Sequence, residues 1–149
     1  MFNGSSSAST LFIATAVIEL GAGLALLTCP SATAVLLVGA PLEAPASLTV
    51  ARVAGAALLA LGIACWLARG DAHSRAARGL VPAMVLYNFG VAVILGAAGI
   101  RSQTVGIALW PAVMLHAMMT VWCIASLLGG NAAHVAAFSF VAQPPRIFR

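Results

Sequence analysis

The chain has 149 residues, of which 62% are hydrophobic and only 7% are charged, and its mean hydropathy is +1.08. A soluble domain of this length carries about a quarter charged residues, because its surface must face water. This composition excludes a soluble globular protein and predicts a single-domain integral membrane protein. The net charge of +4 does not indicate nucleic-acid binding, because the basic residues, all arginines, are spread over predicted loops and the tail and form no basic face.

Four apolar segments, residues 10–28, 49–68, 80–100 and 106–128, match the ~20 residues that cross a bilayer as a helix. Backbone polar groups in hydrocarbon must be satisfied within the segment, so each segment is predicted to be a helix. The first segment has no basic residues before it and carries Glu19 near its middle, so it is expected to be a retained span and not a signal peptide. The predicted fold is all-α: a transmembrane four-helix bundle forming one domain over residues 1–149.

Two shorter stretches complete the predicted architecture. Pro30 opens an apolar run that ends at Gly39 and Pro41, which predicts a short interfacial helix between the first two spans. Residues 131–149 are moderately apolar and are expected to form a cytoplasmic interfacial tail.

The arginines predict the orientation. The loop between the second and third spans and the tail carry five of them, and the opposite side carries two: Arg69, Arg75, Arg78, Arg146 and Arg149 against Arg52 and Arg101. By the positive-inside rule both termini are expected in the cytoplasm of a multi-pass protein. The use of arginine without lysine suggests a bacterial source, and thus the inner membrane.

Small residues predict where the helices approach each other, since helix association in lipid depends on close packing. Ala51 and Gly55 form a small-xxx-small pair, with Gly62 further along the second span, and Ala92 and Gly96 form one in the third. Two further small-residue sets are Gly21 with Ala25 in the first span and Ala56, Ala60 and Ala64 in the second. The two small faces of the second span predict a central helix contacted from both sides.

Ionisable and polar residues inside the spans are the candidate functional residues, because such groups are costly in hydrocarbon. At 1.5 Å per residue, Glu19 and Asn88 lie roughly 12–13 Å, and His116 about 18 Å, from the predicted cytoplasmic side. Tilt or side-chain reach closes that difference, so an intramembrane polar cluster of Glu19, Asn88 and His116 is predicted, with Tyr87 as a fourth member. Arg52 lies further out and is expected to pair with Glu43 or with a lipid headgroup phosphate.

His116, Met119 and Cys123 are spaced so that they share one helix face, and they carry the ligand types that copper(I) or a haem iron accepts. A single helix face cannot complete a metal site. The other two histidines, His73 and His134, fall in a predicted loop and in the tail, so a haem held by two histidines of one chain is excluded. Cofactor identity therefore stays open, and the sequence requires no haem, copper or quinone.

Catalytic chemistry is not indicated. Asp71 is the single aspartate and lies in a predicted loop, and no nucleophile with a neighbouring base and no phosphate-binding loop can be recognised. The protein is therefore expected not to be an enzyme.

Three stretches carry a resemblance: "ATAVIELGAGLALLTCPSATAVLLVGAPL", "ARVAGAALLALGIACWLAR" and "LWPAVMLHAMMTVWCI". With the first helix ending in proline, a short amphipathic stretch and Arg52-x-x-Gly55 opening the second helix, the chain resembles small uncharacterised bacterial membrane proteins of the DoxX-like pattern. The resemblance implies a four-helix fold. Some DoxX relatives are associated with quinone-linked sulfur chemistry, but no residue here matches a position that would carry that activity.

Three functions remain as hypotheses. The first is a small non-enzymatic inner-membrane protein that forms homo-oligomers or serves as an accessory subunit or scaffold of a larger membrane complex, with lipid as its other partner. The second is a binder of a redox cofactor, a metal or a quinone-like lipophilic ligand, centred on His116 and Glu19. The third is a small proton-coupled transporter that uses Glu19. A polar cluster that only fixes the register of the helices is the alternative to the last two.

Overall fold

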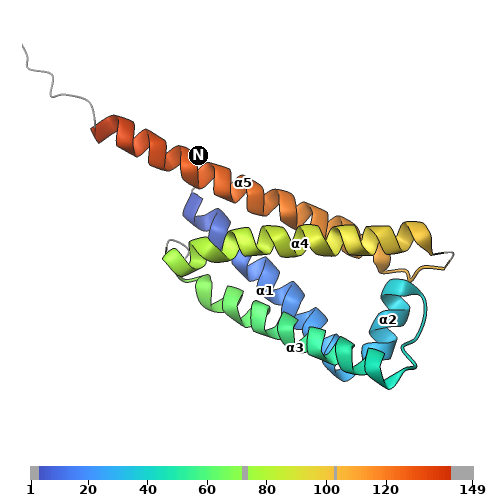
Figure 1. Ribbon diagram of the computed structural model, residues 1–149. Helices are drawn as coiled ribbons and strands as arrows, with labels where there is room; N and C mark the ends of the chain where they lie inside the picture. Colours follow the sequence, from blue (N-terminus) through green and yellow to red (C-terminus); the bar gives the residue numbers. More distant parts are fainter. Residues whose placement is uncertain (1–3, 72–73, 103, 142–149) are drawn as a thin grey trace, which may run out of the picture.

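The computed structural model describes residues 4–71, 74–102 and 104–141, and this part of the chain forms helices and no strand (Figure 1). The helices are, in order, α1 (Gly4–Thr28), α2 (Pro30–Val38), α3 (Pro45–Ala68), α4 (Arg75–Arg101) and α5 (Leu109–Val141). All except α2 contain a stretch long and apolar enough to cross a membrane. The prediction of an all-helical chain with four such helices is confirmed.

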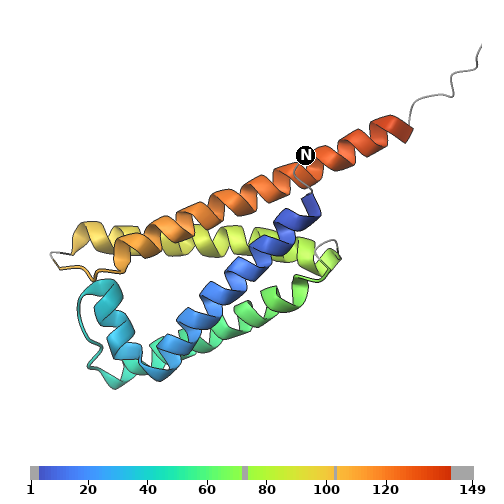
Figure 2. The ribbon, with the colours of Figure 1, turned by 180° about the vertical axis from the view of Figure 1, so that it is seen from behind.

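The long helices form two pairs. α1 packs along α3 and α4 packs along α5, while contacts between the two pairs are sparser. Figures 1 and 2 show that the pairs lie close together where α1 and α4 begin and separate toward the end that holds α2. We call these the narrow end and the wide end.

The short helix α2 connects the two pairs at the wide end. Pro30 occupies its first turn, where a missing N–H costs nothing, and Gly39 ends it with a left-handed φ of 79°. The loop before α5 then binds its last turn, because Gly106 N–H donates to the Leu37 carbonyl at 3.2 Å and Ala108 N–H to the Leu36 carbonyl at 2.9 Å. The helix predicted from Pro30 to Gly39 is therefore present. It follows α1 directly in the chain, and hydrogen bonds join its last turn to the loop before α5.

Glycines allow α1 and α3 to touch backbone to backbone. A Cβ on Gly55 would lie 2.8 Å from the Gly23 carbonyl oxygen, and a Cβ on Gly62 would lie 2.8 Å from Leu20 Cγ. The predicted packing role of Gly55 and Gly62 therefore matches close contacts. The partner on α1 is Gly23, whereas a Cβ on the expected residue, Gly21, would meet nothing within 4 Å.

The other predicted small residues are packed less tightly. Ala51, Ala92 and Gly96 are half-buried, and a Cβ on Gly96 would meet Val113 Cγ1 at an ordinary 3.9 Å. The second small face of α3, formed by Ala56, Ala60 and Ala64, is exposed. The expectation of a central helix contacted from both sides is not met within the chain, because α3 packs mainly on α1 and only slightly on α4.

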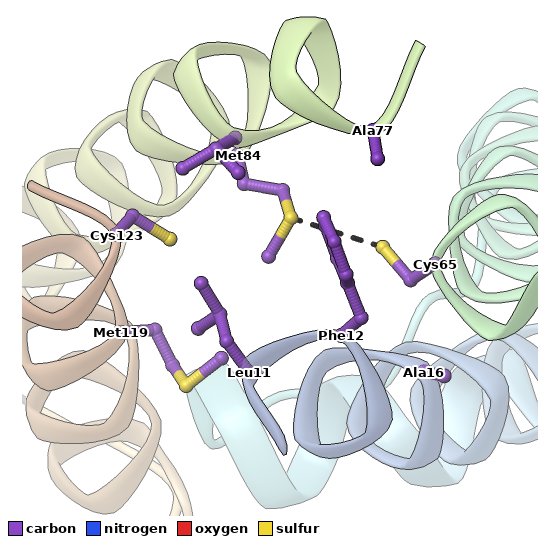
Figure 3. Close-up of a cluster of buried hydrophobic side chains, with 9 residues drawn as sticks. Leu11, Phe12, Ala16, Cys65, Ala77, Met84, Met119 and Cys123 are labelled. Carbon is purple, nitrogen blue, oxygen red and sulfur yellow. Dashed lines mark hydrogen bonds between the residues drawn. The ribbon is translucent and has the colours of Figure 1, made fainter. Parts of the chain in front are cut away.

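A sulfur-rich hydrophobic core holds the two pairs together at the narrow end (Figure 3). Its members come from all four long helices: Leu11, Phe12, Ala16, Cys65, Ala77, Val81, Met84, Met119 and Cys123. The Cys65 thiol lies 3.8 Å from the Met84 sulfur, and Phe12 and Leu11 fill the centre. Thioether side chains suit this role because they fill irregular gaps.

The end of α5 differs from the expected tail. The helix continues from Leu109 to Val141 without a break at Gly129 or Asn131, and it extends beyond the other helices (Figure 1). Up to residue 141 the expected separate tail is thus a continuation of α5, since glycine next to glycine weakens a helix but does not remove a hydrogen bond. Residues 142–149, with Arg146 and Arg149, and His73 lie outside the described residues, and so does the side chain of His134.

Candidate functional site

Four polar side chains meet in the middle of the molecule, at the wide-end edge of the core. Glu19 on α1 is 2% exposed, Asn88 on α4 is 1% exposed and His116 on α5 is 9% exposed. Tyr87, next to Asn88, is half-buried. These are the four residues that the sequence grouped as an intramembrane cluster, and we refer to them as the polar cluster.

Hydrogen bonds connect the residues of the polar cluster, one between the two helix pairs and one within a pair. The Tyr87 hydroxyl donates to Glu19 Oε2 at 2.8 Å, which joins α4 to α1. Asn88 Oδ1 lies 2.8 Å from His116 Nδ1, which joins α4 to α5. The rings of Tyr87 and His116 meet edge to face, with centroids 5.8 Å apart and an interplanar angle of 83°. The cluster therefore contains two polar links and one aromatic contact.

Asn88 is also bound to its own helix. Its Nδ2 donates to the Met84 carbonyl at 2.8 Å, one turn earlier. The Thr120 hydroxyl donates to the carbonyl of His116 at 2.8 Å. Such local bonds fix the position of the side chains that carry them, because they satisfy polar groups that are buried away from water.

A cavity of about 400 Å³ lies between the helix pairs on the wide-end side of the polar cluster. All five helices contribute to it: Ile18, Glu19, Ala22, Leu26, Thr33, Leu37, Ala54, Leu58, Tyr87, Val91, Leu95, Ala112, Leu115 and His116. Its walls are almost entirely apolar, and Glu19, Tyr87 and His116 supply its main polar groups. Small-molecule sites have this composition, with apolar walls and a few convergent polar groups.

A second hollow, an open groove of about 590 Å³, runs along the outside of α1 and α5. It is lined by Ala14, Ile18, Met114, Leu115, Ala117, Met118, Met119, Val121, Trp122 and Ala125. Ile18 and Leu115 line both the groove and the cavity. These two side chains therefore stand between the cavity and the outer surface of the bundle.

The predicted pair of Arg52 and Glu43 is not formed. Both residues are exposed, and the described part of the chain contains no ion pair between them. Arg52 is on the first half of α3 and Glu43 is in the loop before it. The alternative partner of Arg52, a lipid phosphate, stays a prediction.

The three residues considered for a metal are divided between two environments. His116 faces Asn88 and the cavity, whereas Met119 and Cys123 belong to the hydrophobic core. Across residues 4–71, 74–102 and 104–141, no three His, Cys, Asp or Glu side chains come close enough to hold a metal ion. A metal held by His116, Met119 and Cys123 stays a prediction.

Sequence reasoning missed two features of this region. The first is the cavity itself, which depends on how far the helix pairs separate. The second is Thr15, one turn before Glu19 on α1, whose buried hydroxyl has no hydrogen-bond partner within the described chain. The four-residue spacing of Thr15 and Glu19 could have shown that both side chains lie on one face of α1.

Comparisons with known proteins give no family. No protein-family model, no curated protein and no solved structure matches the chain. What the molecule establishes by itself is its class: an all-helical protein with four helices that could cross a membrane and a buried polar cluster beside an apolar cavity.

Proposed function

We propose that this protein is a membrane protein that binds a small lipophilic ligand in the cavity beside the polar cluster. The observation that carries the proposal is the combination of an apolar cavity of about 400 Å³ with Glu19, Tyr87 and His116 in its lining. A cavity of this size holds a small organic molecule, since ligand pockets range from about 300 to 1,000 Å³. The proposal corresponds to the lipophilic-ligand hypothesis drawn from the sequence.

The architecture supports a ligand site more strongly than a purely structural cluster. A structural cluster needs only mutual hydrogen bonds, and helices that carry one can pack tightly around it. Here the helix pairs separate directly beyond the cluster, and α2 is held across the gap by the carbonyls of Leu36 and Leu37. The separation leaves the polar groups at the boundary of an apolar space.

Ala112 provides the test, because it lines the cavity one turn before His116 and has no polar role. Ala112→Phe fills the cavity with a ring, and Ala57→Phe, at an exposed position that lines neither hollow, is the matched control. Native mass spectrometry of protein taken from its membrane in lipid nanodiscs should detect a bound apolar molecule in the wild type and in Ala57→Phe. Ala112→Phe should lose it. An equal amount bound to Ala112→Phe, or none in the wild type, would contradict the proposal.

The proposed location is a bacterial inner membrane, with the narrow end in the cytoplasm. Arg69, Arg75 and Arg78 surround the narrow end, whereas Arg52 and Arg101 are at the wide end. This asymmetry supports the orientation by the positive-inside rule. The DoxX-like resemblance stays part of this proposal, as a likeness of sequence pattern.

Assembly with a second copy, or with a larger membrane complex, is the second candidate function. The exposed small-residue face Ala56, Ala60 and Ala64 of α3 favours it, because small side chains let another helix approach closely. Ala60→Phe should reduce oligomers of the protein in nanodiscs, while Ala83→Phe, at an exposed position on α4, should have a smaller effect. A wild-type protein that is monomeric at every protein-to-lipid ratio would exclude the homo-oligomer.

A further inference from the structure

The orientation of the Asn88 amide determines which nitrogen of His116 carries the hydrogen. The Met84 carbonyl accepts and cannot donate, so the amide group that faces it at 2.8 Å must be the NH₂ of Asn88. Asn88 Oδ1 therefore faces His116 Nδ1, also at 2.8 Å. An oxygen that can only accept requires a hydrogen on Nδ1. His116 is thus held as the Nδ1–H form.

The second ring nitrogen of His116 is left for a ligand. In the neutral imidazole with hydrogen on Nδ1, Nε2 carries a lone pair and acts as an acceptor. No ion pair joins Glu19 and His116 within the described chain, and an isolated imidazolium in an apolar cavity is costly, so the neutral ring is the favoured state. His116 lines the cavity, and Nε2 makes no hydrogen bond to the described residues.

Glu19 contributes a second ligand-binding atom with a different character. Its Oε2 accepts from the Tyr87 hydroxyl, which leaves Oε1. Oε1 accepts when the carboxyl group is ionised and donates when it carries the proton. The cavity therefore offers one fixed acceptor, His116 Nε2, and one group that can act in either sense.

We infer that the ligand of this site carries a hydroxyl head group, as an apolar alcohol or phenol does, and that the hydroxyl donates to His116 Nε2. The inference rests on the proposed ligand-binding function and specifies its chemistry. A hydroxyl has a single hydrogen, so when it donates to Nε2 its oxygen can accept from Glu19 with the proton on Oε1, and one group then satisfies both side chains. A carbonyl or an ether has no hydrogen to donate and leaves Nε2 unpaired, which is costly in an apolar site.

The cavity and the groove together indicate where the apolar part of the ligand lies. From a head group at His116 and Glu19, the apolar part of the ligand would pass Ile18 and Leu115, which line both hollows, to reach the open groove along α1 and α5. The groove is lined by alkyl, thioether and Trp122 side chains and carries no charged residue among those that line it. An alkyl chain therefore leaves the bundle sideways, in the direction from which a lipid-dissolved molecule arrives.

A matched pair of probes tests the head group. 4-Nonylphenol and 4-nonylanisole have the same ring and alkyl chain, and the methyl ether lacks the hydroxyl hydrogen. Their affinities are measured in nanodiscs containing the wild type, with empty nanodiscs correcting for partition into lipid. The phenol should bind about tenfold more tightly than the anisole, because the anisole leaves the buried acceptor unpaired.

Two variants test whether the preference for the phenol over the anisole comes from the His116 imidazole. His116→Phe keeps the bulk and removes the acceptor, so the two probes should bind equally. Asn88→Leu removes the group that holds the Nδ1–H form and should reduce the preference without filling the cavity. Equal binding of both probes to the wild type, or an unchanged preference in His116→Phe, overturns the inference while the ligand site stands. Binding of neither probe to the wild type contradicts the proposed function itself.

A spectroscopic measurement does not depend on whether the variants fold. The ¹⁵N resonances of the wild-type protein labelled on histidine distinguish the Nδ1–H from the Nε2–H form. We expect His116 to show the Nδ1–H pattern and 4-nonylphenol to shift its Nε2 resonance, with a smaller shift from 4-nonylanisole. An Nε2–H signal for His116 would overturn the inference.

Discussion

At the scale of single residues, few groups of the polar cluster connect the two helix pairs in the middle of the molecule. One hydrogen bond, from Tyr87 to Glu19 Oε2, joins α4 to α1, and Asn88 joins α4 to α5. In the proposed membrane setting, no water replaces a lost partner. The bond of Tyr87 to Glu19 is therefore the one side-chain hydrogen bond of the polar cluster that holds the pairs together across the gap.

Removing the Tyr87 hydroxyl should weaken the molecule measurably. Tyr87→Phe keeps the ring edge that meets His116 and leaves Glu19 Oε2 without its donor. We expect the free energy of unfolding in mixed detergent micelles to fall by about 1 kcal/mol, the scale of a hydrogen bond between membrane helices. Glu19→Gln is the control, because its amide oxygen still accepts from Tyr87. A Tyr87→Phe protein as stable as the wild type would mean that this bond contributes nothing.

At the scale of helices, the packing of α1 on α3 depends on backbone contact, whereas the packing of α4 on α5 uses side chains. Gly23 and Gly55 face each other with carbonyl oxygens 2.7–2.8 Å from where a Cβ would be. On α4, by comparison, a Cβ on Gly96 would lie at ordinary contact distance from Val113, and one on Gly99 would meet Leu109 Cδ2 at 2.7 Å, which is the end of a flexible side chain and not backbone. The first pair is therefore the one that tolerates substitution least.

Two glycine-to-alanine substitutions, one at a close helix contact and one at an open position, distinguish the effect of close packing on stability from the effect of helix propensity. Gly55→Ala should lower stability by roughly 1–3 kcal/mol, since a Cβ placed against backbone cannot be relieved by a side-chain rotation. Gly21→Ala, where a Cβ has open space, should be neutral or stabilising, because alanine favours helix over glycine by about 1 kcal/mol. Unfolding in mixed micelles measures both. If the two substitutions behave alike, close contact is not what holds α1 to α3.

The long helices could be predicted from the sequence, whereas which helix packs against which could not. The helices follow from hydropathy alone, and counting residues along them placed Glu19, Asn88 and His116 within about one turn in depth. The choice of neighbours did not follow, because Gly21 and Gly23 look alike in the sequence and only Gly23 meets Gly55. The cavity was equally out of reach, since it arises from the separation of two pairs and from α2 bound by backbone groups that have no side-chain signature.

At the scale of the whole molecule, the accessibility of the three cysteine thiols can be used to determine the orientation of the protein in the membrane. Cys29 lies between α1 and α2 at the wide end and is exposed, whereas Cys65 and Cys123 are buried in the core near the narrow end. The two ends of the molecule thus differ in thiol accessibility. The proposed orientation places Cys29 outside the cytoplasm.

Labelling of intact cells with a membrane-impermeant maleimide should modify Cys29 alone. Cys29→Ser should abolish the signal, and Cys65 and Cys123 should react only after denaturation, because no reagent reaches them in the core. Ser74→Cys in the Cys29→Ser background carries a thiol at the narrow end and should react only in opened cells. Labelling of Ser74→Cys but not of Cys29 in intact cells would reverse the proposed orientation.

The pairing of α1 with α3 and of α4 with α5 has a consequence for biosynthesis. Each pair is a contiguous half of the chain, residues 4–71 and 74–141, so the first half can form its helical hairpin before the second half has left the ribosome. The first half can bury its glycine contact alone, but its share of the polar cluster, Glu19, has no donor until Tyr87 arrives. Insertion of the second hairpin therefore completes both the core and the cavity in one step, and an interruption between residues 71 and 74 would leave two halves that still recognise each other.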